Sequence, residues 1–196
     1  TQLLDDQAAK RAVALATDMT TGDQTLVYHD SASGADAENA EVLAAARQAI
    51  QDDRSKIYDL SGRRIFIETF NPPLRMLIVG AVHIAQPLSR MASVAGYDVT
   101  VIDPRASFAT DERFPGISLN GEWPDDAMKV LDPDRRTAVV TLTHDPKLDD
   151  PGLEVALRSD AFYIGALGSR KTHAGRVGRL TEAGFTESEI ARSHAP

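Results

Sequence analysis

The chain has 196 residues, of which 42% are hydrophobic and 26% charged, a composition and length that suit one globular domain with a smaller appendage. A formal net charge of −8 argues against broad nucleic-acid binding, which depends on Lys and Arg neutralising phosphates. Because cysteine is absent and no apolar stretch approaches the roughly 18 residues of a membrane span, disulfides, thiolate metal sites and a transmembrane helix are excluded within this sequence.

The sequence Asn71-Pro72-Pro73 predicts a boundary, because proline cannot donate to a strand ladder and pushes the preceding residue into an extended conformation. Residues 1–71 predict a small α+β region, interpreted as the remnant of a longer N-terminal domain, with no catalytic constellation. Residues Asp30–Asp36 are a polar stretch rich in Ser, Gly and Asp. The predicted elements are strands at Ala12–Thr17 and Thr25–His29, a helix at Ala37–Gln51, and a hairpin of Lys56–Leu60 and Arg63–Phe70.

Residues 72–196 show a different pattern, in which strands and helices alternate. Predicted strands are Met76–Val79, Asp98–Ile102, Ala138–Leu142 and Phe162–Ile164. Predicted helices are Ile84–Ala95, Asp149–Arg158, a basic helix after Ser169, and a last helix with the Thr186/Glu189 capping box. Repeated βα units predict an α/β fold: a Rossmann-like, mostly parallel sheet with helices on both faces.

The first candidate site is the turn that follows the first of these strands. Gly80, Ala81 and His83 open a helix, and Asp103 ends the next strand, which is the context of a dinucleotide-binding turn. Val82 stands where that fingerprint has its second glycine, and its side chain would obstruct a pyrophosphate. Two alternatives stay open: a turn kept only for packing, and an Asp103 that caps its own turn instead of binding a diol.

The second candidate site follows the strand that ends at Leu142, on the edge where open α/β sheets place their ligands. His144, Asp145 and Lys147 offer a proton carrier, an acceptor and a cation within four residues. We expect His144 and Lys147 to lie near a ligand. Asp149 and Asp150 are assigned to capping, because a helix start is predicted there with a proline in its first turn.

The third candidate site is a glycine-rich turn that enters the basic helix. Free amides, the helix dipole and basic side chains would all attract an anion there. Two cations at a helix N-terminus cost roughly 0.3–1 kcal/mol each without a counter-charge, so they call for an anionic ligand or a carboxylate of the protein. A solvated basic face is the alternative. The residues assigned to this site are Gly165, Gly168, Ser169, Arg170, Lys171 and Thr172, with His83 and His173 as further hypothetical ligands or proton donors.

Taken together, these segments resemble the C-terminal Rossmann-like domain of the XdhC/CoxI family of xanthine dehydrogenase accessory factors. The resemblance spans roughly residues 63–196, and its two most specific motifs are Leu142–Pro151 and Phe162–His173. Two departures from the family are visible. The family turn reads Gly-Ala-Gly-His, whereas this sequence has Val82 in place of the second glycine, and the family carries a Ser-Gly-Gly-Cys motif that this sequence lacks. Family members also continue beyond the position of Pro196, so a fragment is expected.

The resemblance implies a function in handling molybdenum cofactor (molybdopterin) for a molybdenum hydroxylase such as xanthine dehydrogenase. It implies an accessory protein of the cytoplasm, with no catalytic residue and no resident metal site, whereas a homodimer stays open. The cofactor's phosphate is expected on the Gly165–Thr172 turn, and the turn with His83 and Asp103 is expected to form a neighbouring wall. The alternatives are an NAD(P)-dependent oxidoreductase, which Asp103 favours and Val82 opposes, and a pure protein-interaction module.

Overall fold

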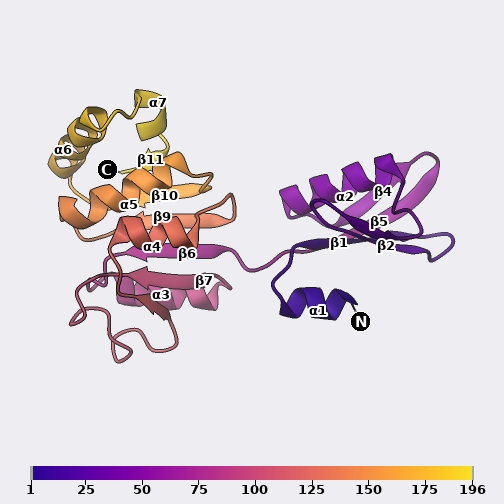
Figure 1. Ribbon diagram of the computed structural model, residues 1–196, viewed down its shortest axis with the longest axis horizontal. Helices are drawn as coiled ribbons and strands as arrows, with labels where there is room; N and C mark the ends of the chain where they lie inside the picture. Colours follow the sequence, from indigo (N-terminus) through magenta and orange to yellow (C-terminus); the bar gives the residue numbers. More distant parts are fainter. Residues whose placement is uncertain (1, 196) are drawn as a thin grey trace. The chain divides into compact units, whose positions relative to one another are not determined.

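The structure, a computed structural model, describes residues 2–195 and divides into two compact units, one up to Pro73 and one from Leu74 (Figure 1). Within the described residues, no helix is both long and apolar enough to cross a membrane. Each unit has a sheet and a hydrophobic core of its own.

The first unit is an antiparallel sheet with the strand order β3-β2-β1-β5-β4. Its strands are β1 (Val13–Asp18), β2 (Gln24–Val27), β3 (Ala32–Gly34), β4 (Lys56–Leu60) and β5 (Arg63–Phe70). Helix α2 (Ala40–Asp52) packs its buried alanines on one face, and α1 (Gln2–Ala8) lies at the other face (Figure 1). The β4–β5 hairpin has the predicted bounds, and its turn residues Ser61 and Gly62 both have positive φ, as a two-residue hairpin turn requires. Strand β3 lies within the polar stretch Asp30–Asp36 and was not predicted, because its three residues are too few to show an alternation of apolar and polar side chains.

Arg63 of β5 links the end of strand β1 to the segment that follows β3. The Arg63 guanidinium donates to Asp18 at 2.7 Å and to both carboxylate oxygens of Asp36 at 2.8 and 2.9 Å. The backbone amide of Thr20, followed by Arg63, lowers the pKa of Asp18, and Arg63 lowers the pKa of Asp36. A carboxyl group whose folded-state pKa is depressed stabilises the fold above its unfolded pKa of about 3.9, and that stabilisation is lost as the pH falls through the folded value.

We therefore expect the first unit to lose stability below about pH 4, and Arg63→Gln to weaken it at neutral pH while reducing this acid dependence. The amide NMR signals of β1 and β5, followed through an acid titration, measure both effects. Arg64→Gln is the matched control, because Arg64 is the exposed neighbour on the same strand. An Arg63→Gln variant that keeps the wild-type acid transition would contradict this account.

The second unit is a six-stranded, fully parallel sheet with the order β11-β10-β9-β6-β7-β8. Its strands are β6 (Arg75–Val79), β7 (Asp98–Ile102), β8 (Ser118–Asn120), β9 (Thr137–Thr141), β10 (Tyr163–Ala166) and β11 (Ser193–His194). Its helices are α3 (Ala85–Val94), α4 (Pro124–Leu131), α5 (Pro146–Arg158), α6 (Arg170–Glu182) and α7 (Glu187–Ile190). The predicted Rossmann-like class is confirmed.

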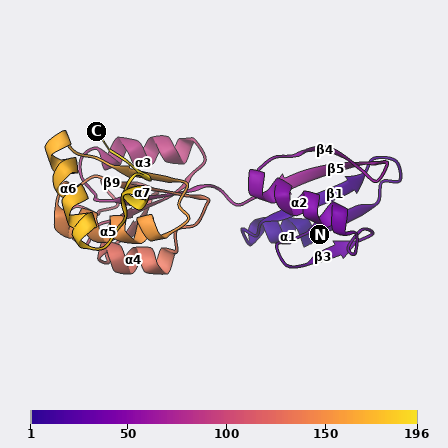
Figure 2. The same ribbon diagram turned by 90° about the horizontal axis from the view of Figure 1, so that it is seen from above.

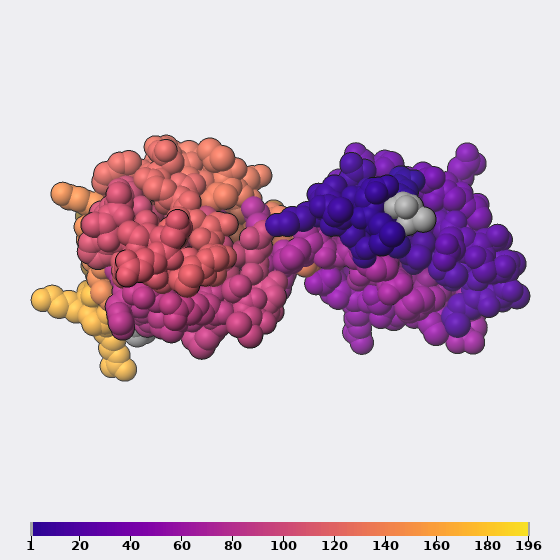
Figure 3. Space-filling model, turned by 90° about the horizontal axis from the view of Figure 1, so that it is seen from below, coloured from indigo at the N-terminus to yellow at the C-terminus, as the bar shows by residue number. Residues whose placement is uncertain are grey.

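Successive side chains along a strand point to opposite faces of the sheet and so belong to two separate hydrophobic cores. On β6, Leu77 and Val79 pack with α4, α5 and α6, whereas Ile78 packs with α3 on the opposite face. Figure 2 shows α3 on one side of the sheet and both α4 and α5 on the other. The segment around α4 lies on the surface of this unit in Figure 3. These layers leave the carboxyl ends of the strands as one continuous edge.

Two boundaries near this edge differ from the predictions. Helix α5 begins at Pro146 and not at Asp149, because Asp145 caps it by accepting from the amide of Lys147. Gly165 belongs to strand β10 and not to the turn that follows, since it pairs with Val140 of β9. The capping box predicted at Thr186 is present at the start of α7.

Candidate site at the carboxyl edge of the parallel sheet

The candidate residues gather where the order of the sheet reverses. Strands β6 and β9 are neighbours, yet the chain leaves them in opposite directions, toward β7 and toward β10. Open α/β sheets bind their ligands outside the carboxyl ends of the strands at such a point. The loops after β6, β7, β9 and β10 therefore form the candidate site.

The loop after β6 is fixed by a close approach between Gly80 and Thr143. Gly80 has φ of +107°, and a Cβ added to it would lie 2.3 Å from Cγ2 of Thr143. Glycine is required here for two reasons, the backbone conformation and the space that Thr143 fills. This contact holds the loop after β6 against the loop after β9.

Asp103 is fully buried and its carboxylate is engaged on both oxygens. It accepts from the amide of Ala81 at 2.8 Å and from the amide of Arg105 at 2.9 Å, and it pairs with the Arg105 guanidinium at 2.7 and 2.8 Å. Burial alone would raise the pKa of Asp103, but the bonds from Arg105 and Ala81 outweigh burial and lower it. Asp103 thus caps its own turn, the alternative that the sequence left open, and its assignment to a ligand stays a prediction.

Asp149 is buried beneath the loop after β9. Its carboxylate accepts from the hydroxyl of Thr143 at 2.7 Å, from the amide of Thr143 at 3.2 Å and from the amide of His144 at 3.0 Å. Burial raises the pKa of Asp149. The assignment of Asp149 to capping of its own helix was wrong, because its side chain reaches back to the loop that precedes α5. The same assignment was wrong for Asp150, which pairs with Arg179 of α6.

Arg176 is the counter-charge of Asp149, and both are only 1% exposed. The guanidinium Nη2 lies 3.7 Å from Asp149 and donates to the carbonyl of Leu167 at 3.0 Å, while Nη1 donates to that of Ala166 at 3.4 Å. Nε of Arg176 is buried and has no partner among the described residues. The pair thus braces the loop after β9 against the turn after β10. His144 joins the brace through Nδ1, which lies 3.1 Å from the same Leu167 carbonyl.

Sequence reasoning missed the role of Arg176, although a signal was present. Arg176 lies on the helical face that also carries Val177 and Leu180, and both of those residues pack into the core. A charged residue at a core-facing position needs a buried partner. What the sequence does not reveal is that this partner is Asp149, which comes from another helix.

The turn after β10 leads into the N-terminus of α6. Ser169 caps the helix by accepting from the amide of Thr172, and a Cβ on Gly168 would lie 3.1 Å from that threonine's side chain. The amides of Arg170 and Lys171 lie in the first helical turn, where no carbonyl of the same helix can reach them. Their side chains are exposed, whereas the buried guanidinium of Arg176 lies behind Gly168 and is paired with Asp149.

The structure brings most of the predicted site residues to one edge. The imidazole of His144 contacts the Leu167 carbonyl in the turn after β10, and Gly80 packs against Thr143 in the loop after β9. The side chains of His83 and Lys147 lie exposed at the starts of α3 and α5. Nδ1 of His173 is buried and has no partner in the described part of the chain. No group of three or more His, Asp or Glu side chains in that part could hold a metal ion.

Comparison with known proteins agrees with this fold. Residues 76–196, more than half of the chain, match the XdhC Rossmann domain. The chain belongs to the XdhC family.

Individual XdhC relatives are longer than this chain. The molybdenum cofactor insertion chaperone PaoD of Escherichia coli is 32% identical over 127 residues, which are 65% of this chain and 34% of the relative. A Bacillus subtilis protein named as a probable xanthine dehydrogenase subunit is 29% identical over 117 residues, which are 59% of this chain and 34% of the relative. The chain thus spans about a third of the length of these curated relatives.

A solved structure supports the fold of the chain. A Bacillus halodurans protein described as a xanthine dehydrogenase superimposes with a TM-score of 0.68 at 22% identity and covers 92% of this chain and 54% of its own. At this identity the similarity concerns the fold alone.

Proposed function

We propose that this chain binds the molybdenum cofactor as cargo and takes part in its insertion into a molybdenum hydroxylase such as xanthine dehydrogenase. The observation that carries the proposal is the turn after β10. The first turn of α6 offers two backbone amides that have no acceptor within the helix, and Arg170 and Lys171 add two exposed cations beside them, a combination suited to a phosphate. The relative PaoD, named for insertion of this cofactor, supports the proposed function.

In this proposal the cofactor's terminal phosphate lies at the N-terminus of α6, where the side chains of Arg170 and Lys171 contact it. The brace between Arg176 and Asp149 holds the turn in place while the loops with His144 and His83 form the neighbouring wall. Binding and release then require no proton transfer by the protein. The function is therefore sequestration and delivery.

The alternative, an NAD(P)-dependent oxidoreductase, is favoured by the strand order and by the turn at Gly80. It is opposed by Val82, which occupies the position where a pyrophosphate approaches. It is also opposed by Asp103, whose oxygens are already engaged by Arg105 and Ala81. NADH is therefore the comparison ligand in the test below.

The test is anaerobic incubation with isolated molybdenum cofactor, followed by gel filtration and by fluorescence of the oxidised pterin in the protein fraction. We expect near-stoichiometric pterin with the protein and no retained NADH. Retention of NADH without pterin would instead support the oxidoreductase. Retention of neither, together with stable binding to a molybdenum hydroxylase, would support an interaction module.

The double variant Arg170→Ala/Lys171→Ala is expected to weaken cofactor binding by about tenfold or more, because it removes two charge-assisted contacts to the phosphate. The matched control is Arg90→Ala/Arg135→Ala, which removes two exposed positive charges elsewhere in the second unit. Unchanged retention in a folded Arg170→Ala/Lys171→Ala variant would overturn this placement of the phosphate.

A further inference from the structure

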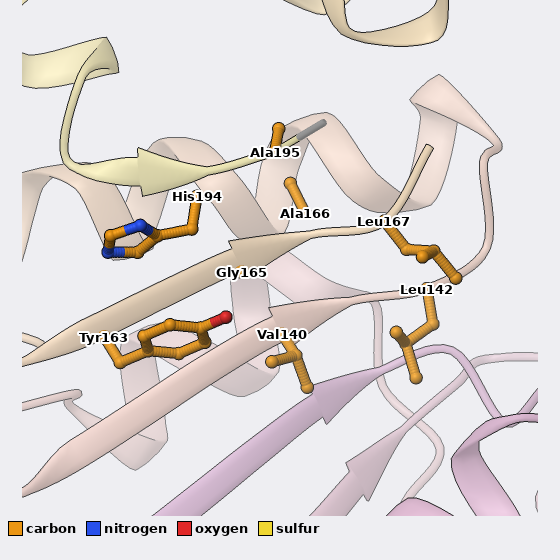
Figure 4. Close-up of a pocket in the computed structure, with 8 residues that line it drawn as sticks. All are labelled: Val140, Leu142, Tyr163, Gly165, Ala166, Leu167, His194 and Ala195. Carbon is orange, nitrogen blue, oxygen red and sulfur yellow. The ribbon is translucent and has the colours of Figure 1, made fainter. Parts of the chain in front are cut away.

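A groove of about 350 Å³ lies on the face of the sheet that also carries α3, over strands β9, β10 and β11 (Figure 4). Helices α5, α6 and α7 contribute their buried side chains to the core on the opposite face. The groove is lined by Val140, Leu142, Tyr163, Gly165, Ala166, Leu167, His194 and Ala195. It has the size of a small-molecule site and a mainly apolar lining with a few polar atoms.

One end of the groove is an aromatic platform. The rings of Tyr163 and His194 are stacked, with 5.0 Å between their centroids and 8° between their planes. Figure 4 shows the two rings face to face, on the adjacent strands β10 and β11. Tyr163 is 41% exposed, so the platform offers ring surface to a ligand. The phenol oxygen and the imidazole nitrogens add hydrogen-bonding atoms at its edge.

The floor of the groove depends on Gly165. A Cβ at this position would lie 2.9 Å from Cε1 of Tyr163 and 3.1 Å from Cγ1 of Val140. The absence of a side chain therefore lets the tyrosine ring lie across β10 and keeps the groove open above the strand. This explains a glycine that the backbone conformation does not require, since its φ is not positive.

The other end of the groove reaches the carboxyl edge of the sheet. Figure 4 shows Leu142 and Leu167 at the end opposite to Tyr163 and His194. Leu167 is followed directly by Gly168 and Ser169, the turn that begins α6. The apolar, aromatic groove thus ends at Leu167, next in sequence to the turn that carries Arg170 and Lys171. This combination matches the chemistry of a flat heterocycle that carries a phosphate.

We propose that the groove holds the pterin ring of the cofactor, stacked on the Tyr163–His194 platform, while the phosphate lies on the turn after β10. The inference rests on the function proposed above and adds the site of the organic ring. Charge complementarity with the turn favours this ligand over an apolar segment of protein. Stacking on aromatic rings tolerates different heterocycles, so the adjoining phosphate site supplies the preference.

The test uses two probes with the whole chain, hydroxymethylpterin and its phosphate ester, and follows pterin fluorescence in a titration. We expect the ester to bind more tightly than the alcohol. Tyr163→Ala and His194→Ala should each raise the Kd of both probes by about tenfold, because each variant removes one ring of the platform. Arg170→Ala/Lys171→Ala should abolish only the advantage of the ester. Phe162→Ala is the matched control, since this adjacent ring is 49% exposed and lies outside the groove.

The outcomes separate the groove from the phosphate site. If Tyr163→Ala and His194→Ala bind both probes like the wild type, the groove proposal fails, while a lost ester advantage in Arg170→Ala/Lys171→Ala still supports the phosphate site. If neither probe binds the wild type, the groove proposal also fails, and retention of the intact cofactor tests the proposed function separately. A dimer that Tyr163→Ala dissociates, without pterin binding, would assign the groove to a second copy of the chain. Far-UV circular dichroism confirms that each variant is folded.

Discussion

Arg176→Leu is expected to destabilise the second unit by about 3–5 kcal/mol, because it leaves the buried Asp149 without its counter-charge. It also removes the donors to the carbonyls of Ala166 and Leu167. Urea unfolding followed by the fluorescence of Trp123 measures this loss. Trp123 is the only tryptophan of the chain and lies in the second unit, so its signal reports on that unit alone.

Arg179→Leu is the matched control for Arg176→Leu. Arg179 lies one turn further along α6 and pairs with Asp150, but its side chain is 40% exposed. A pair that is this open to solvent contributes less than about 1 kcal/mol. A combined Asp149→Asn/Arg176→Leu variant should recover part of the loss, because no uncompensated charge remains. Equal losses for Arg176→Leu and Arg179→Leu would show that the buried brace does not hold the loops.

Gly80→Ala is expected to destabilise the second unit by about 2–5 kcal/mol, the sum of an unfavourable backbone conformation and a collision with Thr143. The same fluorescence measurement applies. Thr143→Ser in the Gly80→Ala background should relieve the collision, because it removes Cγ2 and keeps the hydroxyl that bonds to Asp149. The backbone part of the cost should remain.

Gly116→Ala separates these two contributions. Gly116 has φ of +73° and open space around its added Cβ, so its substitution should cost only the backbone part, about 1–2 kcal/mol. If Gly80→Ala costs no more than Gly116→Ala, the contact with Thr143 does not position the loops of the site.

The sequence predicts the elements that carry a strong local signal. In the β4–β5 hairpin, apolar and polar side chains alternate on either side of a two-residue turn, and strand β7 follows Gly96, the glycine after α3. Both elements were predicted with the observed bounds. Strands β8 and β11 have only three and two residues, which is too short for any periodicity to appear. Helix α4 was missed although Pro124 and the acidic residues of its first turn are helix-start signals, because its eight residues are too short for a clear apolar periodicity.

The sequence indicated that the candidate residues lie at one edge of the sheet, but it did not reveal most of their contacts. Glycine turns and polar residues after strands indicate the carboxyl edge, since parallel strands bring those ends together. The engagement of Asp103 by Arg105, two residues further on, was one of the alternatives that the sequence left open. The pairing of Asp149 with Arg176 joins two helices, a contact that local patterns do not encode. The platform of Tyr163 and His194 was missed for the same reason, because β11 lies far along the chain from β10.

The most direct test of the central claim is hydrogen–deuterium exchange of the whole chain with and without bound molybdenum cofactor. We expect protection of the carboxyl-edge loops at residues 80–85 and 142–147, and of residues 163–173, which include β10 and the turn into α6. We expect unchanged exchange in strands β1 to β5 of the first unit. Bound cofactor that protects the first unit and leaves residues 163–173 unchanged would contradict the proposed site.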